Sequence, residues 1–242
     1  WDDASHVDRL VEAGVEIVRG RGRLDGPGRV LVEGADGATH ELVARRGVVL
    51  NAGTEPARLP IDGLDATPYW TNREVVRLTE LPRSLVVIGG GPIGCELTQA
   101  FARFGVDVTL LEVAPRILGP EEPESSDVIR GVLRAEGVDV REGVSITGVR
   151  HDGRFHVDLG DEVVSADQLL VAAGRRTQLS GIGLETVGLA DDLRVIETDE
   201  RMRAGERLWA VGDATGKGAF THVSMYQAAV VVRDLLGEDG PW

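Results

Sequence analysis

The clearest hydrophobic pattern in the sequence lies in residues 85–112. An unbroken apolar run, LVVI, predicts a buried strand at residues 85–88. Glycines follow, and apolar residues then recur at steps of three and four, which predicts a helix with one buried face. A second apolar run at residues 107–111 predicts the next strand. The predicted buried face of the helix comprises Ile93, Leu97, Ala100, Phe101 and Phe104.

The same periods predict elements on both sides of this stretch. Short helices are expected at residues 5–14 and 72–78, and longer ones at 126–136 and 222–236. Strands are expected at residues 15–18, 138–141 and 207–213. Alternating strands and tight turns predict antiparallel meanders at residues 29–50 and 145–171, and residues 56–82 form a connection rich in proline, glycine and threonine. The predicted inward face of the third helix comprises Val128, Ile129, Val132 and Leu133.

Two stretches of the sequence repeat one plan. Residues 48–53 read VVLNAG and residues 169–174 read LLVAAG. The chain therefore twice leads an apolar strand out of a meander into Ala-Gly. The first run ends with Ala52 and Gly53, and the second ends with Gly174. We interpret the echo as an internal duplication of a nucleotide-binding plan in an α/β fold.

The glycines between the first strand and helix have dinucleotide-binding spacing. Gly89, Gly91 and Gly94 follow the order G-x-G-x-x-G, in which the first turns the chain, the second admits a pyrophosphate and the third lets the helix pack closely. Pro92 and Ile93 begin the helix, whose N-terminal N–H groups would face the phosphates. Glu112 stands about twenty residues beyond, where an acid accepts the ribose hydroxyls. The context of strand, helix and terminal acid favours nucleotide binding over an unliganded glycine turn.

A second junction of this kind stands near the end of the sequence. The apolar stretch RLWAVGD ends in Gly212 and Asp213, and a glycine-rich turn then leads into the helix at 222–236. An aspartate at the carboxyl end of a buried strand accepts hydrogen bonds from ligand hydroxyls, and the helix N-terminus adds N–H donors. Without the wider pattern, Asp213 could equally cap a turn.

Composition narrows the functional classes. The 26 basic and 40 acidic residues give a formal charge of −14, which disfavours nucleic acid and anionic membrane surfaces as partners. No apolar run approaches the length of a membrane helix, and the start, WDDASHVDRL, lacks an export signal, so we expect a cytoplasmic protein. Cys95 is the single cysteine, which excludes an internal disulfide and a clustered cysteine metal site.

The motifs VVLNAGTEP, VVIGGGPIGCELTQAF, VTLLE, LLVAAGRRTQ and RLWAVGDATG, in this order, resemble the pyridine nucleotide-disulfide oxidoreductases. These are flavoenzymes that include dihydrolipoamide dehydrogenase and mercuric reductase. The resemblance covers essentially the whole chain and implies a Rossmann-like, doubly wound parallel sheet with an antiparallel β-meander, the FAD/NAD(P)-binding fold. It also implies an NAD domain at residues 72–196, inserted in a partial FAD domain at residues 1–71 and 197–242.

The resemblance also assigns roles to single residues. It implies FAD contacts at Gly22, at Ala52 and Gly53, and at Asp213, which would bind the ribityl chain. A helix N-terminus would lie under the flavin ring, where its partial positive charge would stabilise reduced flavin. The resemblance implies that Glu96 lies near N5 of the flavin. The residues expected at that helix N-terminus are Thr221, His222 and Val223.

Several family features are missing from the sequence. The redox cysteine pair, the lysine that pairs with Glu96 and the first FAD glycine motif do not occur from Trp1 onward. The resemblance also implies a C-terminal interface domain, through which the parent protein would form a homodimer, and it would begin where this chain stops. We therefore expect an internal fragment that is inactive by itself, since it lacks the first FAD glycine motif and the groups for the second half-reaction, and we expect a structural role for Cys95.

The nicotinamide preference follows from the end of the second strand. The Glu112 carboxylate would pair with a ribose 2′-OH and repel the 2′-phosphate of NADP. Val113 stands where an NADP-specific relative would carry arginine, although Arg116 is close in sequence. NAD is favoured over NADP.

The function predicted from the sequence is hydride transfer between NAD(P)H and FAD, with onward transfer to a disulfide, a metal ion or another small-molecule acceptor. Two alternatives stay open. One is a non-catalytic NAD-binding module, and the other is a flavin-dependent NADH dehydrogenase without redox cysteines.

Overall fold

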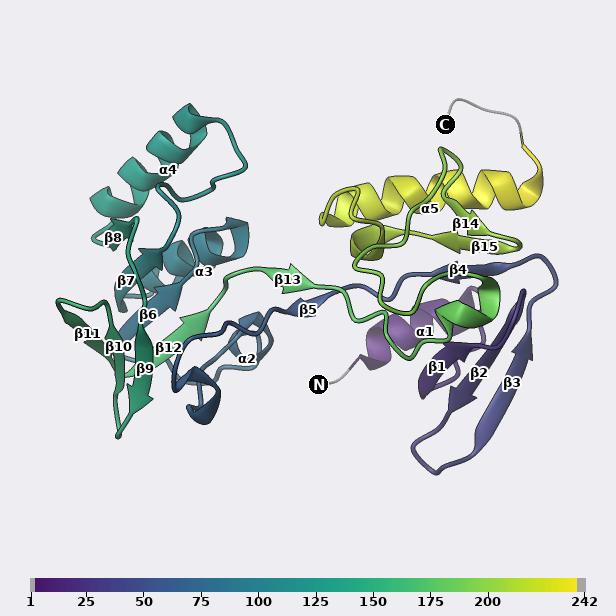
Figure 1. Ribbon diagram of the computed structural model, residues 1–242, viewed down its shortest axis with the longest axis horizontal. Coiled ribbons are helices and arrows are strands. Elements are labelled where there is room, and N and C mark those ends of the chain that lie inside the picture. Colours follow the sequence, from purple (N-terminus) through teal and green to yellow (C-terminus); the bar gives the residue numbers. More distant parts are fainter. Residues whose placement is uncertain (1–2, 239–242) are drawn as a thin grey trace. The chain divides into compact units, whose positions relative to one another are not determined.

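The computed structural model describes residues 3–238 and divides into two compact units (Figure 1). The first unit spans Trp1–Glu55 and Arg176–Trp242, and the second spans Pro56–Arg175. Two short strands, β5 (Glu55–Pro56) and β13 (Arg175–Arg176), pair where the chain passes between the units. The second unit is thus inserted in the sequence of the first.

The unit boundaries differ from the 71/72 and 196/197 boundaries expected from the sequence. Residues 56–71 pack with the second unit, because Trp70 donates its N–H to Leu169 and accepts the N–H of Val171, each at 2.8 Å. Leu64 is fully buried in the same core. Residues 176–196 instead pack with the first unit, whose core includes Leu179, Leu184 and Ile196.

The second unit is built on a parallel four-stranded sheet in the order β12-β6-β7-β8. Its strands are β6 (Ser84–Ile88), β7 (Asp107–Glu112), β8 (Asp139–Glu142) and β12 (Gln168–Val171). The helices are α2 (Asn72–Val75), α3 (Pro92–Arg103) and α4 (Pro123–Ala135), with the 3-10 turn η1 (Leu64–Ala66). A separate antiparallel sheet contains β9 (Gly148–His151), β10 (Phe155–Asp158) and β11 (Val163–Ala166).

The alternation of side chains along the parallel strands produces two cores. Leu85 and Val87 of β6 pack in a cluster with Phe101 of α3 and Leu133 of α4, while Val86 and Ile88 pack in another cluster with residues of β9, β10 and β11. The parallel sheet is therefore covered by helices on one face and by the antiparallel sheet on the other. This burial on both faces explains the unbroken apolar run in the sequence.

The first unit contains two three-stranded sheets. One is antiparallel and comprises β1 (Arg21–Leu24), β2 (Arg29–Glu33) and β3 (Thr39–Val43). The other is mixed, with β15 (Leu208–Ala210) antiparallel to β14 (Arg203–Gly205) and parallel to β4 (Val48–Leu50). The helical segments are α1 (Ala4–Glu12), η2 (Leu184–Val187), η3 (Gly212–Thr215) and α5 (Thr221–Leu236).

Both predicted meanders lose their last strand to another sheet. β4 leaves the meander of residues 29–50 and pairs with β15, and β12 leaves that of residues 145–171 and pairs with β6. In each case the apolar strand takes the end position of its new sheet and runs parallel to its neighbour. The two strands that carry the echoed sequences therefore have equivalent pairing.

Other sequence predictions were wrong in detail. Residues 15–18 form no strand, because no described segment pairs with them. β1 was not predicted at all, and it takes the edge of the antiparallel sheet. Helix α4 begins at Pro123, three residues before the expected start at residue 126, and Pro123 stands at the first helical position. Its residue Val128 is 63% exposed and Phe104 of α3 is 71% exposed, so neither lies on a buried face.

Candidate functional site

The glycine turn after β6 is sterically required at its first and third positions. Gly89 has a φ of +109°, a conformation that favours glycine. A Cβ atom at Gly94 would lie 1.8 Å from the carbonyl oxygen of Gly89. Helix α3 can approach β6 this closely only because residue 94 has no side chain.

Gly91 differs from its neighbours, because the fold itself does not require a glycine there. Its φ of −74° is open to any residue, and a Cβ atom at this position would meet nothing within 4 Å. Gly91 is the N-cap of α3, Pro92 occupies the first turn, and the first bond of the helix runs from the Cys95 N–H to the Gly91 carbonyl. The N–H groups of Ile93 and Gly94 precede that bond, so the helix start can bind an anion.

Glu112 ends β7 and turns its carboxylate to the glycine turn. One oxygen accepts the N–H of Gly90 at 2.6 Å, and the other accepts the N–H of Ala114 at 2.7 Å. The side chain is half-buried. A carboxylate oxygen has two lone pairs, so each oxygen can accept one further donor, such as a ribose hydroxyl.

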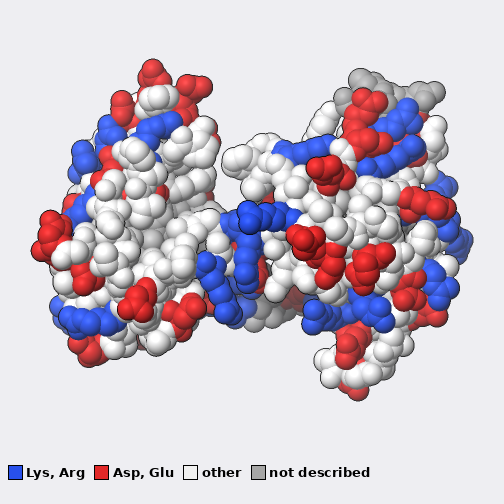
Figure 2. Space-filling view, in the orientation of Figure 1, with Lys and Arg blue, Asp and Glu red and all other residues white. Residues whose placement is uncertain are grey.

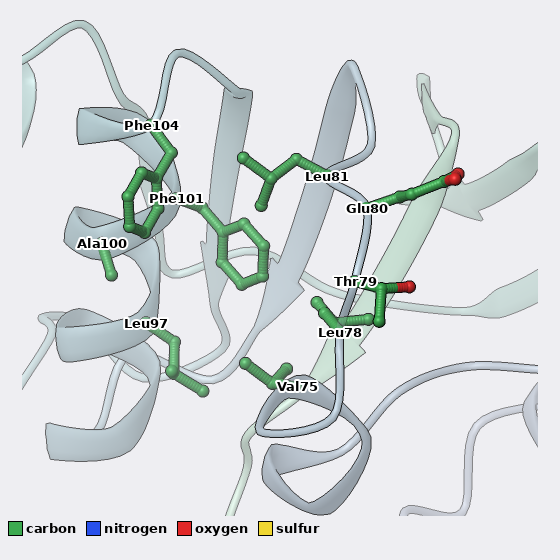
Figure 3. A pocket seen from close by; sticks show the side chains of 9 residues that line it. All are labelled: Val75, Leu78, Thr79, Glu80, Leu81, Leu97, Ala100, Phe101 and Phe104. Carbon is green, nitrogen blue, oxygen red and sulfur yellow. The ribbon is translucent and has the colours of Figure 1, made fainter.

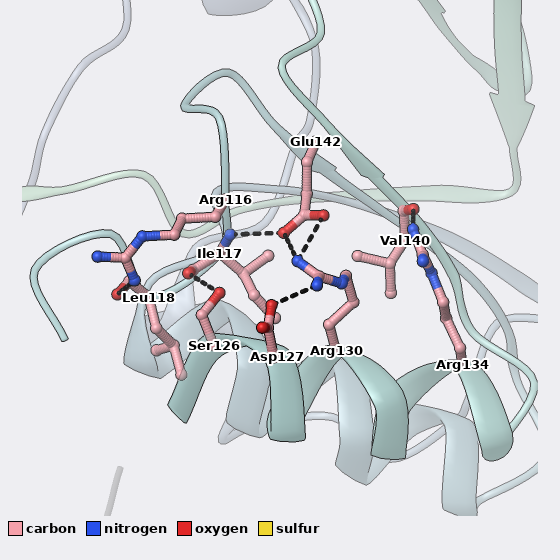
Figure 4. A network of polar contacts seen from close by, with 9 residues as sticks. All are labelled: Arg116, Ile117, Leu118, Ser126, Asp127, Arg130, Arg134, Val140 and Glu142. Atoms are coloured by element: carbon pink, nitrogen blue, oxygen red, sulfur yellow. Dashed lines mark hydrogen bonds and ion pairs between the residues drawn. The ribbon is translucent and has the colours of Figure 1, made fainter. Parts of the chain in front are cut away.

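Arg116 lies in the loop after β7, and its guanidinium is bonded to the loop itself. One terminal nitrogen donates to the carbonyl of Leu118 at 3.2 Å (Figure 4). The other donates to the carbonyls of Gly119 and Glu121, each at 2.7 Å. Val113 is 62% exposed at the start of this loop. The arginine near Glu112 in sequence therefore stabilises the loop.

Gly174 lies just beyond β12, the strand that pairs with β6. The glycine turn packs against the same segment, because a Cβ atom at Gly89 would lie 2.8 Å from the carbonyl carbon of Ala172. Gly174 has a φ of +87° and accepts the N–H of Ala57 at 3.1 Å. β6, β7 and β12 run parallel, so their carboxyl ends lie at one edge of the sheet. Gly174 therefore lies at the same edge as the glycine turn.

Cys95 and Glu96 are neighbours on α3 with opposite surroundings. Cys95 is buried, and its thiol donates to the carbonyl of Gly90 at 3.3 Å. Burial, together with the negative charge of Glu112, raises the pKa of this thiol to about 11, so it stays protonated. Glu96 is exposed on the other side of the helix.

In the first unit, the carboxyl ends of β4 and β15 lie together because the two strands are parallel. β4 leads to Ala52, Gly53 and Thr54, and β15 leads to Gly212 and Asp213. The Thr54 hydroxyl donates to the Asp213 carboxylate at 2.6 Å. The structure therefore brings together the two junctions that the sequence marked separately.

Gly212 is fixed by its neighbours. Its φ is +73°, and a Cβ atom would lie 2.7 Å from the side-chain oxygen of Asn51. Its N–H donates to the buried side chain of Gln227 on α5 at 2.6 Å. This hydrogen bond links the turn at Gly212 to α5. Sequence reasoning missed both Thr54 and Gln227, since nothing local marks a partner so far away in the chain.

Helix α5 begins at Thr221, followed by His222 and Val223, with Phe220 as an N-cap that makes no side-chain cap. The rings of Phe220 and His222 stack with centroids 5.4 Å apart. Thr221 and His222 are exposed. Gly22 lies in β1, in a different sheet from β4 and β15, the strands that lead to Ala52, Gly53 and Asp213.

An apolar cavity of the second unit lies away from the glycine turn. It has a volume of about 350 Å³, and aliphatic and aromatic side chains of α2, α3 and the segment between α2 and β6 line it (Figure 3). On α3 it contacts Leu97 and the residues that follow, which belong to the C-terminal half of the helix. This cavity is therefore not part of the dinucleotide site.

The surface carries both signs of charge. On the face shown in Figure 2, acidic and basic side chains are interspersed over each unit. Across residues 3–238, no helix is long and apolar enough to span a membrane.

Comparison with known proteins agrees with this geometry. The family model for pyridine nucleotide-disulphide oxidoreductases matches residues 4–228. The chain belongs to this family. The match confirms the fold expected from the sequence, a parallel sheet with an antiparallel meander in the FAD/NAD-binding region of flavoprotein oxidoreductases.

Individual relatives place the chain within one region of longer enzymes. It is 36% identical over 232 residues to dihydrolipoyl dehydrogenase 3 of Pseudomonas aeruginosa, covering 92% of this chain and 49% of the relative. It is 36% identical over 241 residues to mercuric reductase of Streptomyces lividans, covering 96% of this chain and 50% of the relative. The chain thus spans about half the length of the curated relatives it matches.

A solved structure has the same arrangement. The HOCl-induced flavoprotein disulfide reductase RclA from Escherichia coli superposes with a TM-score of 0.88 at 28% identity, over 98% of this chain and 55% of that chain. Both the sequence and the fold therefore relate this chain to flavoprotein disulfide reductases.

Proposed function

We propose that the whole protein transfers hydride between NAD(H) and FAD and passes the electrons to a small-molecule acceptor. The second unit would bind NAD and the first unit would bind part of FAD. Membership of the family supports this proposal. The observation that carries it is Gly91, a glycine that the fold leaves open at the start of a helix.

The residues of the second unit fit a dinucleotide. A side chain at Gly91 would occupy the open space that a pyrophosphate needs, and the N–H groups of Ile93 and Gly94 would bind the phosphate oxygens. Glu112 retains acceptor capacity for the ribose hydroxyls. Arg116 is bonded to three carbonyls, which favours NAD over NADP because no cation of this loop is left for a 2′-phosphate.

The residues of the first unit fit part of a flavin nucleotide. Gly53 has a φ of +67°, and a Cβ atom there would meet nothing within 4 Å, so the backbone is open to a ligand. Asp213 accepts the Thr54 hydroxyl and would accept ligand hydroxyls from the same edge. The N-terminus of α5 would stabilise negative charge on reduced flavin.

When bound, FAD supplies the two-electron chemistry and NAD supplies or accepts the hydride. The chain itself binds and orients both cofactors. Glu112 would hold the ribose, Asp213 the ribityl hydroxyls, and Glu96 would lie near the flavin as in the family.

The test is a pair of titrations on the purified 242-residue chain. We expect NADH to quench tryptophan fluorescence saturably, with tighter binding than NADPH, and Gly91→Val to abolish that binding. Gly119→Val, in the same unit, is the matched control. NADH binding that is unchanged in Gly91→Val would sink the proposal for the second unit.

Flavin binding separates the alternatives. A flavin absorption spectrum that survives gel filtration, and is lost in Asp213→Ala, would support the FAD role. A colourless chain that binds NADH would favour the non-catalytic NAD-binding module for this length of chain. NADH oxidation by the full-length protein with a quinone but not with a disulfide would favour the dehydrogenase without redox cysteines.

A further inference from the structure

Gly90 is the middle residue of the glycine turn, and both its N–H and its carbonyl group are hydrogen-bonded within the protein. Its N–H donates to Glu112 at 2.6 Å, and its carbonyl accepts the N–H of Leu118 at 2.7 Å and the thiol of Cys95 at 3.3 Å. These bonds fix the orientation of the turn before any ligand arrives. The position of Leu118 therefore matters to the glycine turn, although the two lie on different loops.

The loop at Ile117 and Leu118 packs directly on Gly90. Ile117 is fully buried, and a Cβ atom at Gly90 would lie 2.6 Å from a methyl carbon of Ile117. Leu118 has a φ of +49°, a left-handed conformation that is unfavourable for a non-glycine residue. Such a conformation persists only where its surroundings hold it.

Glu142, the last residue of β8, accepts a hydrogen bond from the backbone of the same loop. Its carboxylate accepts the N–H of Ile117 at 2.9 Å, and the side chain is 13% exposed (Figure 4). Ser126 on α4 donates to the carbonyl of Ile117 at 2.7 Å. Both polar groups of the Ile117 backbone are thus bonded to side chains of β8 and α4.

Arg130 keeps the Glu142 carboxylate in place. Its guanidinium donates to both oxygens of Glu142, at 3.3 and 3.2 Å, and pairs with Asp127 one turn away on α4. A charged, hydrogen-bonded acceptor in a half-buried setting is a strong partner for a backbone N–H. A continuous series of bonds therefore runs from α4 through Glu142, Ile117 and Leu118 to Gly90.

We propose that Glu142 is a positioning residue of the dinucleotide site, acting through the Ile117–Leu118 backbone on Gly90. The proposal rests on the proposed NAD-binding role of the glycine turn. Glu142 does not touch the ligand. It sets the turn geometry that the pyrophosphate and ribose encounter, so its loss weakens binding by mobilising the turn.

The test compares Glu142→Ala, which removes the acceptor, with Glu142→Gln, which keeps an oxygen for the Ile117 N–H but gives up the charge. Asp139→Ala is the matched control, since it breaks an exposed 2.7 Å ion pair with Arg141 on the same strand. Amide exchange of Gly90 and Leu118 is measured by NMR on the unliganded 242-residue chain. NADH and ADP-ribose affinities are measured on the same proteins.

We expect Glu142→Ala to speed exchange at Gly90 and Leu118 by about tenfold and to weaken NADH and ADP-ribose alike by about tenfold, the size of one charge-assisted hydrogen bond. In Glu142→Gln and Asp139→Ala, the exchange rates and both affinities should stay within about threefold of the wild-type values.

Three results would overturn the proposal. One is exchange at Gly90 in Glu142→Ala that matches the Asp139→Ala control. Another is acceleration spread equally over the β9–β10–β11 sheet, which would indicate general loosening of the unit. The third is a change in exchange and affinity in Glu142→Gln that is as large as the change in Glu142→Ala. If wild type fails to bind NADH, the proposed function fails, while the exchange rates still decide whether Glu142 positions the turn.

Discussion

The Cα of Gly94 faces the carbonyl oxygen of Gly89 so closely that an added Cβ atom would lie 1.8 Å from it. Gly91, three residues earlier, faces open space. The two glycines therefore have separable roles: Gly94 is needed for packing of α3 on β6, whereas packing does not require Gly91, the position proposed for the pyrophosphate.

Alanine substitutions should separate these roles. Gly94→Ala should lower the free energy of unfolding by about 3 kcal/mol, since backbone must move to relieve the overlap. Gly91→Ala should leave thermal stability nearly unchanged but weaken NADH binding by about tenfold or more, because the methyl group would meet the pyrophosphate. Thermal melts and NADH titrations check both. Equal loss of stability in the two variants would contradict the assignment.

The coenzyme preference should depend on Glu112 and not on Arg116. Arg116→Ala removes donors to three loop carbonyls, so it should lower the melting temperature while leaving the ratio of NADH to NADPH affinity within about threefold. Glu112→Gln removes the charge that repels a 2′-phosphate and should shift that ratio toward NADPH by about tenfold. A selective loss of NADPH binding in Arg116→Ala would mean that this side chain reads the phosphate.

Cys95 should be almost inert toward thiol reagents. With the pKa of its buried thiol raised to about 11, the thiolate fraction at pH 8 is on the order of 0.1%. We expect alkylation of the folded chain by iodoacetamide to be at least a hundred times slower than in denaturant, and the native rate to rise until about pH 11. Cys95→Ser keeps a donor to Gly90 and should be more stable than Cys95→Ala. Rapid labelling at pH 7 would contradict this assignment.

The features best predicted from the sequence are those that a short stretch of adjacent residues determines. The β6 strand, the turn at Gly89 and the start of α3 follow from adjacent residues, and all three are present in the structure. The parallel pairing of β4 with β15, and hence the bond from Thr54 to Asp213, joins residues far apart in the chain, so no local period could show it. Glu142 escaped notice for the same reason, because its importance lies in the backbone it bonds.

Helix faces were predicted less well than helices. The three- and four-residue spacing included Phe104 and Val128, which lie at exposed positions of α3 and α4. The buried face of α3 instead includes Gly94, Cys95 and Thr98, small residues that allow the close approach to the sheet. Hydrophobicity alone cannot identify a face that is selected for small size.

Asp234 near the end of α5 should make the first unit sensitive to acid. Its side chain is 2% exposed and accepts two bonds from Arg203, both at 2.6 Å, and one from the Trp209 ring N–H at 2.9 Å. The hydrogen bonds from Arg203 lower the pKa of this carboxyl below its ordinary value, despite the opposing effect of burial. Asp234 thus fastens α5 to β14 and β15 as a carboxylate.

A lowered pKa fixes the direction of the pH effect. The unfolded chain takes up the proton first, at an ordinary value of about 3.9, so the stabilisation is fully present above that pH and is lost as pH falls through the lower folded pKa. Asp234→Asn should therefore cost about 2 kcal/mol at pH 7 and progressively less below about pH 4. Urea unfolding at pH 7, 5 and 3.5, with the exposed turn variant Asp161→Asn as control, measures the difference. A penalty that stays constant down to pH 3 would show that the Asp234 carboxylate does not need its charge to hold α5.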